Sequence, residues 1–304
     1  MTMLARCSLH YLARRFWRPG FGIWAAIFVY VILVSAGPAP GSDAATGDFG
    51  TLGQQLVAEG FDAEQVSNLF VRSDARFDPE SVTLFFLHSE AKLNYKQFLK
   101  PAAIGAAEQY LATYHAELAA AQRHYGVEPE VIAAILLVET RLGNYLGSSR
   151  VFNTLATMAA LQQPVHRQRL WDEISADRRL SRKEFEIKAD RKSRWAYNEL
   201  KAFLRYSAKE GIDPLLISGS YAGAMGICQF MPSNIVRLAA DGNSDGRVDL
   251  FEHADAIASV ARYLQAHGWV ADISDQKAHQ VIRRYNNSRP YADTVLAIAR
   301  QLKG

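Results

Sequence analysis

Residues 129–144, PEVIAAILLVETRLGN, contain the apolar run that most constrains how this chain folds. Pro129 suits the first turn of a helix, where its missing N–H group is harmless. Every residue from 131 to 138 is apolar, so a helix through this run has no polar face to turn toward water. We therefore expect a helix buried on all sides, with other elements packed around it.

The first carboxylate after this run is Glu139, and an acid next to a buried segment is costly unless it has a role. Its helix face is shared by the residues seven, four and three positions earlier, which are Ile132, Ile135 and Leu136. Desolvation there disfavours the charged form, so we expect the pKa of Glu139 to rise toward the range of a general acid. The alternative is that Glu139 lies exposed at the helix end or pairs with Arg141.

Most of the remaining chain also shows helical periodicity, with little strand-like alternation. Asp62 is expected to cap a helix, because its side chain can accept a backbone N–H group in the first turn. A long alanine-rich helical segment is expected to run from Pro101 to Gly126, and residues 195–210 form a further amphipathic helix. The sequence therefore predicts a mainly α fold with one core.

Residues 1–36 have the pattern of a secretory leader. Four arginines precede the uncharged apolar run 21–36, and small residues at its end suit cleavage after Ala36. The alternative is that the run stays uncleaved as a membrane anchor. Residues 37–50, rich in Gly, Pro, Ala and Ser, are predicted to form a linker, and residues 51–304 the functional domain. We expect an exported, periplasmic protein.

The charge distribution gives no argument for a nucleic-acid partner. The formal net charge of +3 falls to −1 when the four leader arginines are set aside. Residues 164–194 hold ten Lys or Arg against six Asp or Glu, which indicates a solvated surface or an exposed helix that at most faces an acidic polymer. Cys7 lies in the leader, so Cys228 is left without a partner and no intrachain disulfide is expected.

Residues 219–233, GSYAGAMGICQFMPS, are rich in glycine and alanine, which allow close approach of backbones. Gln229 adds a donor and an acceptor at the end of this small-residue segment. Such a segment suits the floor of a groove that holds a polar, extended ligand. The alternative is a tightly packed crossing of helices.

Residues 241–252, DGNSDGRVDLFE, match the calcium-loop pattern D-x-[DN]-x-[DN]-G-x5-E at every specified position. Hard oxygen ligands at alternate positions are what Ca²⁺ requires, and Gly246 allows the sharp turn. The alternative is a polar surface turn. The predicted ligands are the side chains of Asp241, Asn243, Asp245 and Glu252 and the carbonyl of Arg247.

In residues 284–291, RYNNSRPY, two tyrosines flank a pair of amide side chains. Rings and amides together suit the hydroxyl and N-acetyl groups of sugars. A capped loop with packed rings is the alternative.

Taken in this order, the stretches resemble the lytic murein transglycosylases of the membrane-bound lytic transglycosylase B type. The likeness covers most of residues 50–304 and is carried by VETRLG, SSRVFNTLATMA, GSYAGAMGICQFMPS, DAIASVARYLQAHGW and RYNNS. It implies a lysozyme-like, mainly helical fold that acts on peptidoglycan glycan strands as a monomer. It also implies cleavage of the MurNAc–GlcNAc β-1,4 bond without water, which leaves a 1,6-anhydro-MurNAc end.

The resemblance implies a role for a single acid. Glu139 would protonate the leaving glycosidic oxygen, and its carboxylate would then take the proton from the C6 hydroxyl that closes onto the anomeric carbon. Ordinary glycosidases need two carboxylates for hydrolysis. By the same resemblance Ser220, Gln229, Tyr285 and Tyr291 would orient the saccharide, with Asn286 as an addition.

The resemblance also bears on the calcium loop, because the family's last carboxylate ligand lies three residues later. Asp255 therefore competes with Glu252 as the closing ligand, and a calcium ion held there would be structural. Residues 270–283 are shorter than the corresponding stretch of longer members, so part of the outer groove is expected to be missing. Three alternatives to a lytic transglycosylase remain, which are a hydrolytic muramidase, a peptidoglycan-binding protein without turnover and a calcium sensor.

Overall fold

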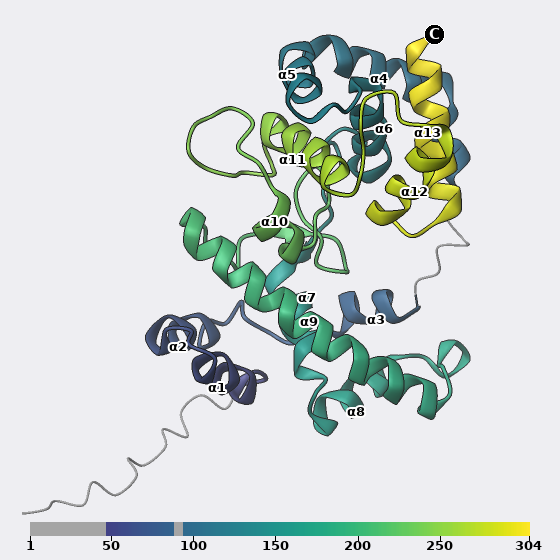
Figure 1. Cartoon of the computed structure of the whole chain (residues 1–304). Coiled ribbons are helices and arrows are strands. Elements are labelled where there is room, and N and C mark those ends of the chain that lie inside the picture. The colour runs from purple at the N-terminus through teal and green to yellow at the C-terminus, as the bar shows by residue number, and fades with distance from the viewer. Residues whose placement is uncertain (1–46, 88–93) are drawn as a thin grey trace, which may run out of the picture. The chain divides into compact units, whose positions relative to one another are not determined.

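The structure is a computed structural model that describes residues 47–87 and 94–304. These residues belong to one compact unit built almost wholly from helices (Figure 1), which confirms the predicted mainly α fold. Residues 1–46, which hold the predicted leader and most of the predicted linker, lie outside the described part. Within that part, no helix combines the length and the hydrophobicity needed to span a bilayer.

Helices follow one another along the described chain, with a small two-stranded sheet between distant segments. The elements are α1 (Gly50–Ala58), α2 (Ala63–Phe70), α3 (Pro79–Leu87), the 3₁₀ helix η2 (Tyr95–Leu99), α4 (Pro101–Thr113), α5 (His115–Tyr125), α6 (Pro129–Thr140), β1 (Ser149–Arg150), α7 (Val151–Ala160), α8 (Pro164–Glu173), the 3₁₀ helix η3 (Ala176–Arg178), α9 (Arg182–Glu210), β2 (Ser218–Gly219), α10 (Pro232–Leu238), α11 (His253–Ala266), α12 (Asp275–Tyr285) and α13 (Arg289–Lys303).

Helix α6 is buried along most of its length, as its apolar sequence predicts. All residues from 131 to 137 are buried, and helices α4, α5, α11 and α13 pack around them. The helix ends at Thr140 because Arg141 adopts a left-handed conformation with φ 51°. Glu139 therefore lies in the last turn of α6, where the core meets the surface.

Helix α7 packs against the long helix α9, and all ten residues of α7 are buried. Only residues 195–210 were expected to form this helix, but α9 begins at Arg182. Ion pairs between residues four apart, Arg182 with Glu186 and Asp190 with Arg194, support the charged part of the helix. The segment predicted to be a charged surface thus supplies the first half of α9.

The predicted helix boundaries at Asp62, Pro101 and Gly126 are confirmed. Asp62 caps α2 by accepting a backbone N–H at 2.8 Å, and Gly126 ends α5 with φ 70°. The segment between Pro101 and Gly126 is divided into α4 and α5, because Tyr114 leaves the helical conformation. The ring of Tyr114 stacks on His253 of α11 at 4.3 Å, a tertiary contact that periodicity does not reveal.

The two-stranded sheet joins the loop after α6 to the segment before α10. Ser149 pairs with Gly219 and Arg150 with Ser218 in antiparallel register. Gly147 lies next to this pair with φ 89°, and a Cβ atom added there would lie 2.2 Å from the carbonyl oxygen of Gly219. Glycine is therefore required where the two backbones meet.

Candidate active site

A cavity of about 430 Å³ surrounds the end of α6. It brings together five residues that the sequence analysis proposed for the site, although they come from segments far apart in the chain. They are Glu139, Ser220, Gln229, Asn286 and Tyr291. The expected apolar face behind the acid is present, because Ile132, Ile135 and Leu136 are fully buried while Glu139 itself is half-buried against the cavity.

Tyr291 of α13 fixes the position of the Glu139 side chain. The buried Tyr291 hydroxyl donates a hydrogen bond to Glu139 Oε1 at 2.5 Å. Burial, and then the charge of Glu139, raise the pKa of Tyr291 well above its ordinary value, so the phenol keeps the proton it donates. The Tyr291 ring is held edge-to-face against Tyr95. The carboxyl of Glu139 thus has one oxygen in a fixed hydrogen bond.

Ser220 lies in a tight turn on the cavity wall. Its hydroxyl oxygen accepts the N–H groups of Ala222 and Ala224 at 3.2 and 3.1 Å. Because the oxygen is already used as an acceptor, the hydroxyl proton is the part of Ser220 that can be offered to a ligand. Ser220 is therefore positioned as a donor.

Gln229, in contrast to Ser220, presents a hydrogen-bond acceptor to the cavity. Its Nε2 group donates to the carbonyls of Gly226 at 2.9 Å and Leu146 at 3.2 Å, which also fixes the orientation of the amide. The side-chain oxygen Oε1 is thus left as an acceptor for a ligand. The Gln229 backbone has φ 50°, an uncommon conformation for a residue with a side chain.

Tyr285 is not among the residues that line this cavity. Its half-buried ring lies behind the wall, and its hydroxyl donates to the carbonyl of Cys228 at 2.5 Å. Burial raises the pKa of Tyr285, so this donor also stays protonated. Tyr285 therefore supports the backbone beside Gln229, and Asn286, the next residue, lines the cavity.

Several aromatic and amide side chains of the cavity were not found from the sequence. Tyr95, Gln97 and Phe98 come from the short helix η2, which matches no motif. Tyr145 lies just after α6 and is 67% exposed, and Tyr221 lies within the small-residue segment. An exposed tyrosine on a cavity wall offers a flat face for a sugar ring. This role could not be predicted from the sequence, because it depends on the exposure of the side chain.

Glu139 is the only Asp or Glu among the described residues that line the cavity. The other polar groups there are hydroxyls, amides and backbone groups. A site of this composition can deliver one proton and hold a neutral, hydroxyl-rich ligand, and its described residues include no second carboxylate to activate water.

The predicted calcium loop forms a compact turn before α11, and none of its predicted ligands lines the cavity around Glu139. Asp241 accepts the N–H groups of three residues of the loop, and Gly246 has φ 86°. Asn243 Nδ2 donates to both Asp245, at 3.2 Å, and Glu252, at 3.0 Å. The side chains of Asn243, Asp245 and Glu252 therefore lie together, while Asp241 holds the backbone of the loop.

Asp255 has a different position. It is 1% exposed, and its two oxygens accept the N–H groups of Gly242 at 2.8 Å and Asp249 at 2.6 Å, so that it fastens both ends of the loop. The oxygen donors of the loop are of the kind that Ca²⁺ prefers. Among the described residues, however, no three His, Cys, Asp or Glu side chains are placed to hold a metal ion.

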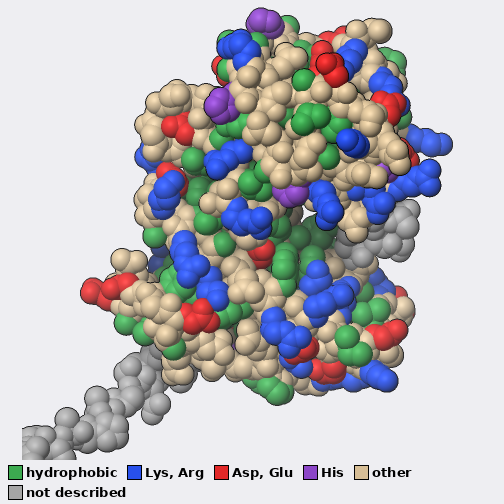
Figure 2. Space-filling model, in the orientation of Figure 1, with side chains coloured by type: hydrophobic (Ala, Val, Ile, Leu, Met, Phe, Trp, Pro, Cys, Tyr) green, Lys and Arg blue, Asp and Glu red, His purple; other side chains and the backbone are tan. Residues whose placement is uncertain are grey.

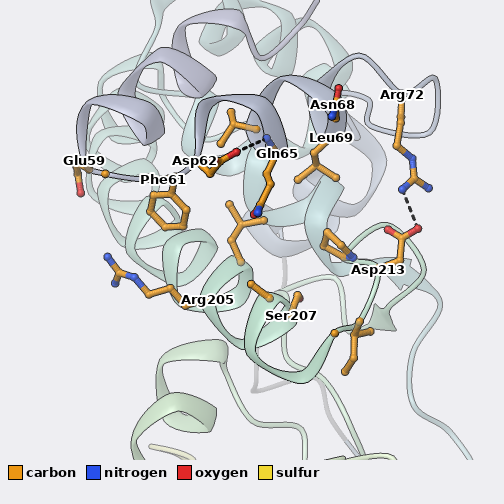
Figure 3. Close-up of a pocket in the computed structure, with 17 residues that line it drawn as sticks. Glu59, Phe61, Asp62, Gln65, Asn68, Leu69, Arg72, Arg205, Ser207 and Asp213 are labelled. Carbon is orange, nitrogen blue, oxygen red and sulfur yellow. Dashed lines mark hydrogen bonds and ion pairs between the residues drawn. The ribbon is translucent and has the colours of Figure 1, made fainter. Parts of the chain in front are cut away.

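A larger cavity of about 640 Å³ lies between α2 and the second half of α9 (Figure 3). Phe61 and Leu69 contribute apolar surface to it. Two of its carboxylates serve structural contacts, because Asp213 pairs with Arg72 at 2.8 Å and Asp62 caps α2. We therefore place the candidate active site at Glu139.

The sequence profile of the transglycosylase SLT domain family matches residues 46–278. The chain belongs to this family. The predicted family resemblance is thereby confirmed. The match includes Glu139, Ser220 and Gln229 of the cavity, and it ends before Asn286 and Tyr291.

Relatives of this SLT domain include the membrane-bound lytic murein transglycosylase B of Escherichia coli strain K12, which is 34% identical over 195 residues. That alignment covers 64% of this chain, and the chain spans only 45% of the relative's length. The E. coli lytic transglycosylase Slt35, solved in complex with bulgecin A, superposes with a TM-score of 0.68 at 25% identity. It covers 84% of this chain and 92% of the Slt35 chain.

A second Slt35 structure, in complex with calcium, gives the same TM-score of 0.68 at 26% identity, with 84% of this chain and 92% of that one covered. SltB3 of Pseudomonas aeruginosa, in complex with NAG-anhNAM-pentapeptide, gives a TM-score of 0.64 at 21% identity. It covers 83% of this chain and 77% of the SltB3 chain, and at this identity it supports the fold alone.

Proposed function

We propose that this SLT domain is a peptidoglycan lytic transglycosylase, which cleaves the MurNAc–GlcNAc β-1,4 bond without water and leaves a 1,6-anhydro-MurNAc end. The observation that carries the proposal is that Glu139 is the single carboxylate among the described residues lining a cavity rich in hydroxyl, amide and aromatic groups. A hydrolase would need a second carboxylate to act on water or on the sugar. The C6 hydroxyl of the substrate supplies the nucleophile instead.

In the proposed first step, the Glu139 carboxyl gives its proton to the glycosidic oxygen while the bond from that oxygen to the anomeric carbon breaks. In the second step, the C6 hydroxyl of the same sugar bonds to the anomeric carbon, and the Glu139 carboxylate takes the hydroxyl proton. The acid is thereby restored. Because Tyr291 donates to Oε1, the transferred proton belongs on the other carboxyl oxygen.

The remaining cavity groups have complementary tasks in this proposal. Ser220 donates and Gln229 accepts, so together they can hold a sugar hydroxyl or N-acetyl group in one orientation. Asn286 adds an amide at the cavity wall, and Tyr145 offers a ring face. Tyr285 acts from behind, by holding the backbone next to Gln229.

The proposal also covers the cellular location of the protein and the metal ion that it would bind. Its substrate lies outside the cytoplasmic membrane, so residues 1–36 would direct export to the periplasm or anchor the protein there. A structural Ca²⁺ would be held by the loop side chains Asp241, Asn243 and Asp245, the carbonyl of Arg247, and Glu252 or Asp255. The calcium complex of Slt35 supports this assignment, and no catalytic step depends on it.

The test is the product analysis of digested sacculi, with the wild-type protein beside Glu139→Gln. Wild type should release fragments with anhydro ends, which mass spectrometry finds to be one water lighter than hydrolytic products. Glu139→Gln should lower the rate by about a hundredfold or more while the protein stays folded and still binds sacculi. Reducing ends without anhydro products would show a muramidase instead, and sacculus binding without turnover by wild type would show a binding protein.

A further inference from the structure

Three positive side chains lie on one face of α9, in the basic segment that the proposed chemistry does not use. Lys188, Arg191 and Lys192 are spaced three and four residues apart, so they are neighbours on the helix surface. Lys188 and Lys192 are half-buried, and Arg191 is exposed. Figure 2 shows Lys and Arg side chains gathered over the part of the molecule where Figure 1 places α3 and α9.

No described carboxylate pairs with any of these three residues. The neighbouring acids of α9 are engaged elsewhere, because Glu186 pairs with Arg167 and Arg182, and Asp190 pairs with Arg194. Burial, and then the nearby charges, lower the pKa of Lys192 and of Lys188. Like charges held together at a partly dehydrated surface are unfavourable without a negative partner.

The basic cluster is connected to the candidate active site through α3. Leu84 of α3 lines the cavity of Glu139, and the next residue, Phe85, stacks on Trp195 of α9 with ring centres 5.8 Å apart. The Lys192 ammonium lies over both rings, 4.5 Å from the centre of Phe85 and 4.9 Å from that of Trp195. Lys188 also contacts α3, since it donates to the carbonyl of Phe86 at 2.6 Å. Positive charge is thus held against α3, the helix whose Leu84 lines the cavity.

We propose that Lys188, Arg191 and Lys192 bind the free carboxylates of the peptide that is attached to the glycan strand. This inference rests on the proposed function. The peptide and the cleaved bond belong to the same sugar of the substrate, so a peptide must leave the cavity beside its wall. A cluster of cations that pairs with no described carboxylate matches the negative charge of the peptide, and the Phe85 and Trp195 rings offer apolar contact to its side chains. The cluster would make the enzyme prefer peptide-bearing strands.

The experiment compares two purified substrates, glycan strands with their peptides and the same strands after amidase treatment has removed them. The test variant is Arg191→Gln with Lys192→Met, which removes two charges and keeps an apolar side chain on the rings. We expect kcat/KM on peptide-bearing strands to fall about tenfold, chiefly through KM, and to stay unchanged on peptide-free strands. Amidation of the peptide carboxylates should lower the wild-type rate to that of the variant.

The matched control is Arg178→Gln with Lys183→Met, which removes the same charge from exposed residues without described ion pairs. Lys183 stands nine residues before Lys192, half a turn around α9, so this control should behave as wild type. Equal losses on both substrates, or an equal loss in the control, would overturn the inference. The inference would also be overturned by a test variant that keeps its preference for peptide-bearing strands but loses binding to phosphatidylglycerol vesicles. The cluster would then face a membrane.

The two proposals fail in different ways. If wild type produces anhydro ends from both substrates at equal rates, only the peptide-binding inference is overturned. If wild type produces no anhydro ends from either substrate, the proposed function itself is wrong.

Discussion

At the scale of single residues, the hydrogen bond between Tyr291 and Glu139 determines the orientation of the carboxyl group. The phenol is buried and its raised pKa keeps it protonated, so it remains a hydrogen-bond donor near neutral pH. A hydrogen bond of this kind holds the carboxyl in one orientation before the substrate arrives. Preorganisation of a catalytic group is a large part of how enzymes lower barriers.

Tyr291→Phe should therefore lower kcat by about tenfold to a hundredfold, since a hydrogen bond to a charged group is worth about 1.5–3 kcal/mol. The ring would still pack against Tyr95, so the melting temperature should change little. Steady-state rates on purified strands measure the effect. An unchanged kcat would mean that the hydrogen bond does not position the acid.

At this scale, the sequence predicts the candidate acid more readily than the residues around it. Glu139 could be proposed because an acid after an apolar helix stands out, and Ser220 and Gln229 because their segment matches a family pattern. Tyr95 and Tyr145 could not, because their role depends on which side of a short 3₁₀ helix or loop faces the cavity. The substrate contact of Tyr285 stays a prediction, and in the structure its hydroxyl donates a hydrogen bond to the backbone carbonyl of Cys228.

At the scale of elements, the core is organised by α6, whose face opposite solvent is filled by large apolar side chains. Ile135→Ala should lower the free energy of unfolding by about 2–5 kcal/mol, because the residue is fully buried and its removal leaves a cavity. The control is Ile187→Ala on α9, where the side chain is 61% exposed and a change of at most about 0.5 kcal/mol is expected. Urea unfolding followed by tryptophan fluorescence gives both values, and similar losses would refute the central place of α6.

The strand pair between β1 and β2 allows a second matched comparison. Gly147 and Gly60 have nearly the same φ, 89° and 91°, but an added Cβ meets the Gly219 carbonyl at Gly147 and open space at Gly60. Gly60→Ala should cost about 1 kcal/mol, the penalty for a left-handed alanine. Gly147→Ala should cost distinctly more and should also reduce activity, because the cavity wall shifts. Equal unfolding midpoints for the two variants would contradict this account.

Elements with local signals were predictable, and those shaped by tertiary contacts were not. Pro101, Gly126 and the Asp62 cap gave correct boundaries because capping acts within one turn. The break at Tyr114 escaped detection, since its cause is a ring from a helix more than a hundred residues away. Helix α9 was predicted as an amphipathic helix over residues 195–210, and its charged half was predicted separately as a solvated surface or an exposed helix.

At the scale of the whole molecule, two histidines make stability depend on pH. Burial lowers the pKa of His166, which stacks on Phe77, and that of His253, which bonds the Tyr110 hydroxyl. The unfolded chain takes up these protons near pH 6.5, whereas the folded protein does so only at lower pH. Stability is therefore full above the unfolded pKa and is lost as the pH falls toward the folded values.

His166→Phe keeps a ring against Phe77 and removes one of the two titrating groups. Its free energy of unfolding should fall less than that of wild type between about pH 7.5 and about pH 5, as measured by urea unfolding at each pH. The difference between the two proteins isolates this residue from all other titrating groups. Parallel pH profiles would show that burial of His166 does not affect stability.

The Tyr291 to Glu139 hydrogen bond connects positions 152 residues apart. While the chain is being synthesised, the helix that carries the acid emerges long before the tyrosine that orients the carboxyl. Under the proposed function, the acid would lack this orientation until helix α13 has docked. Cleavage would then begin only once the domain is complete.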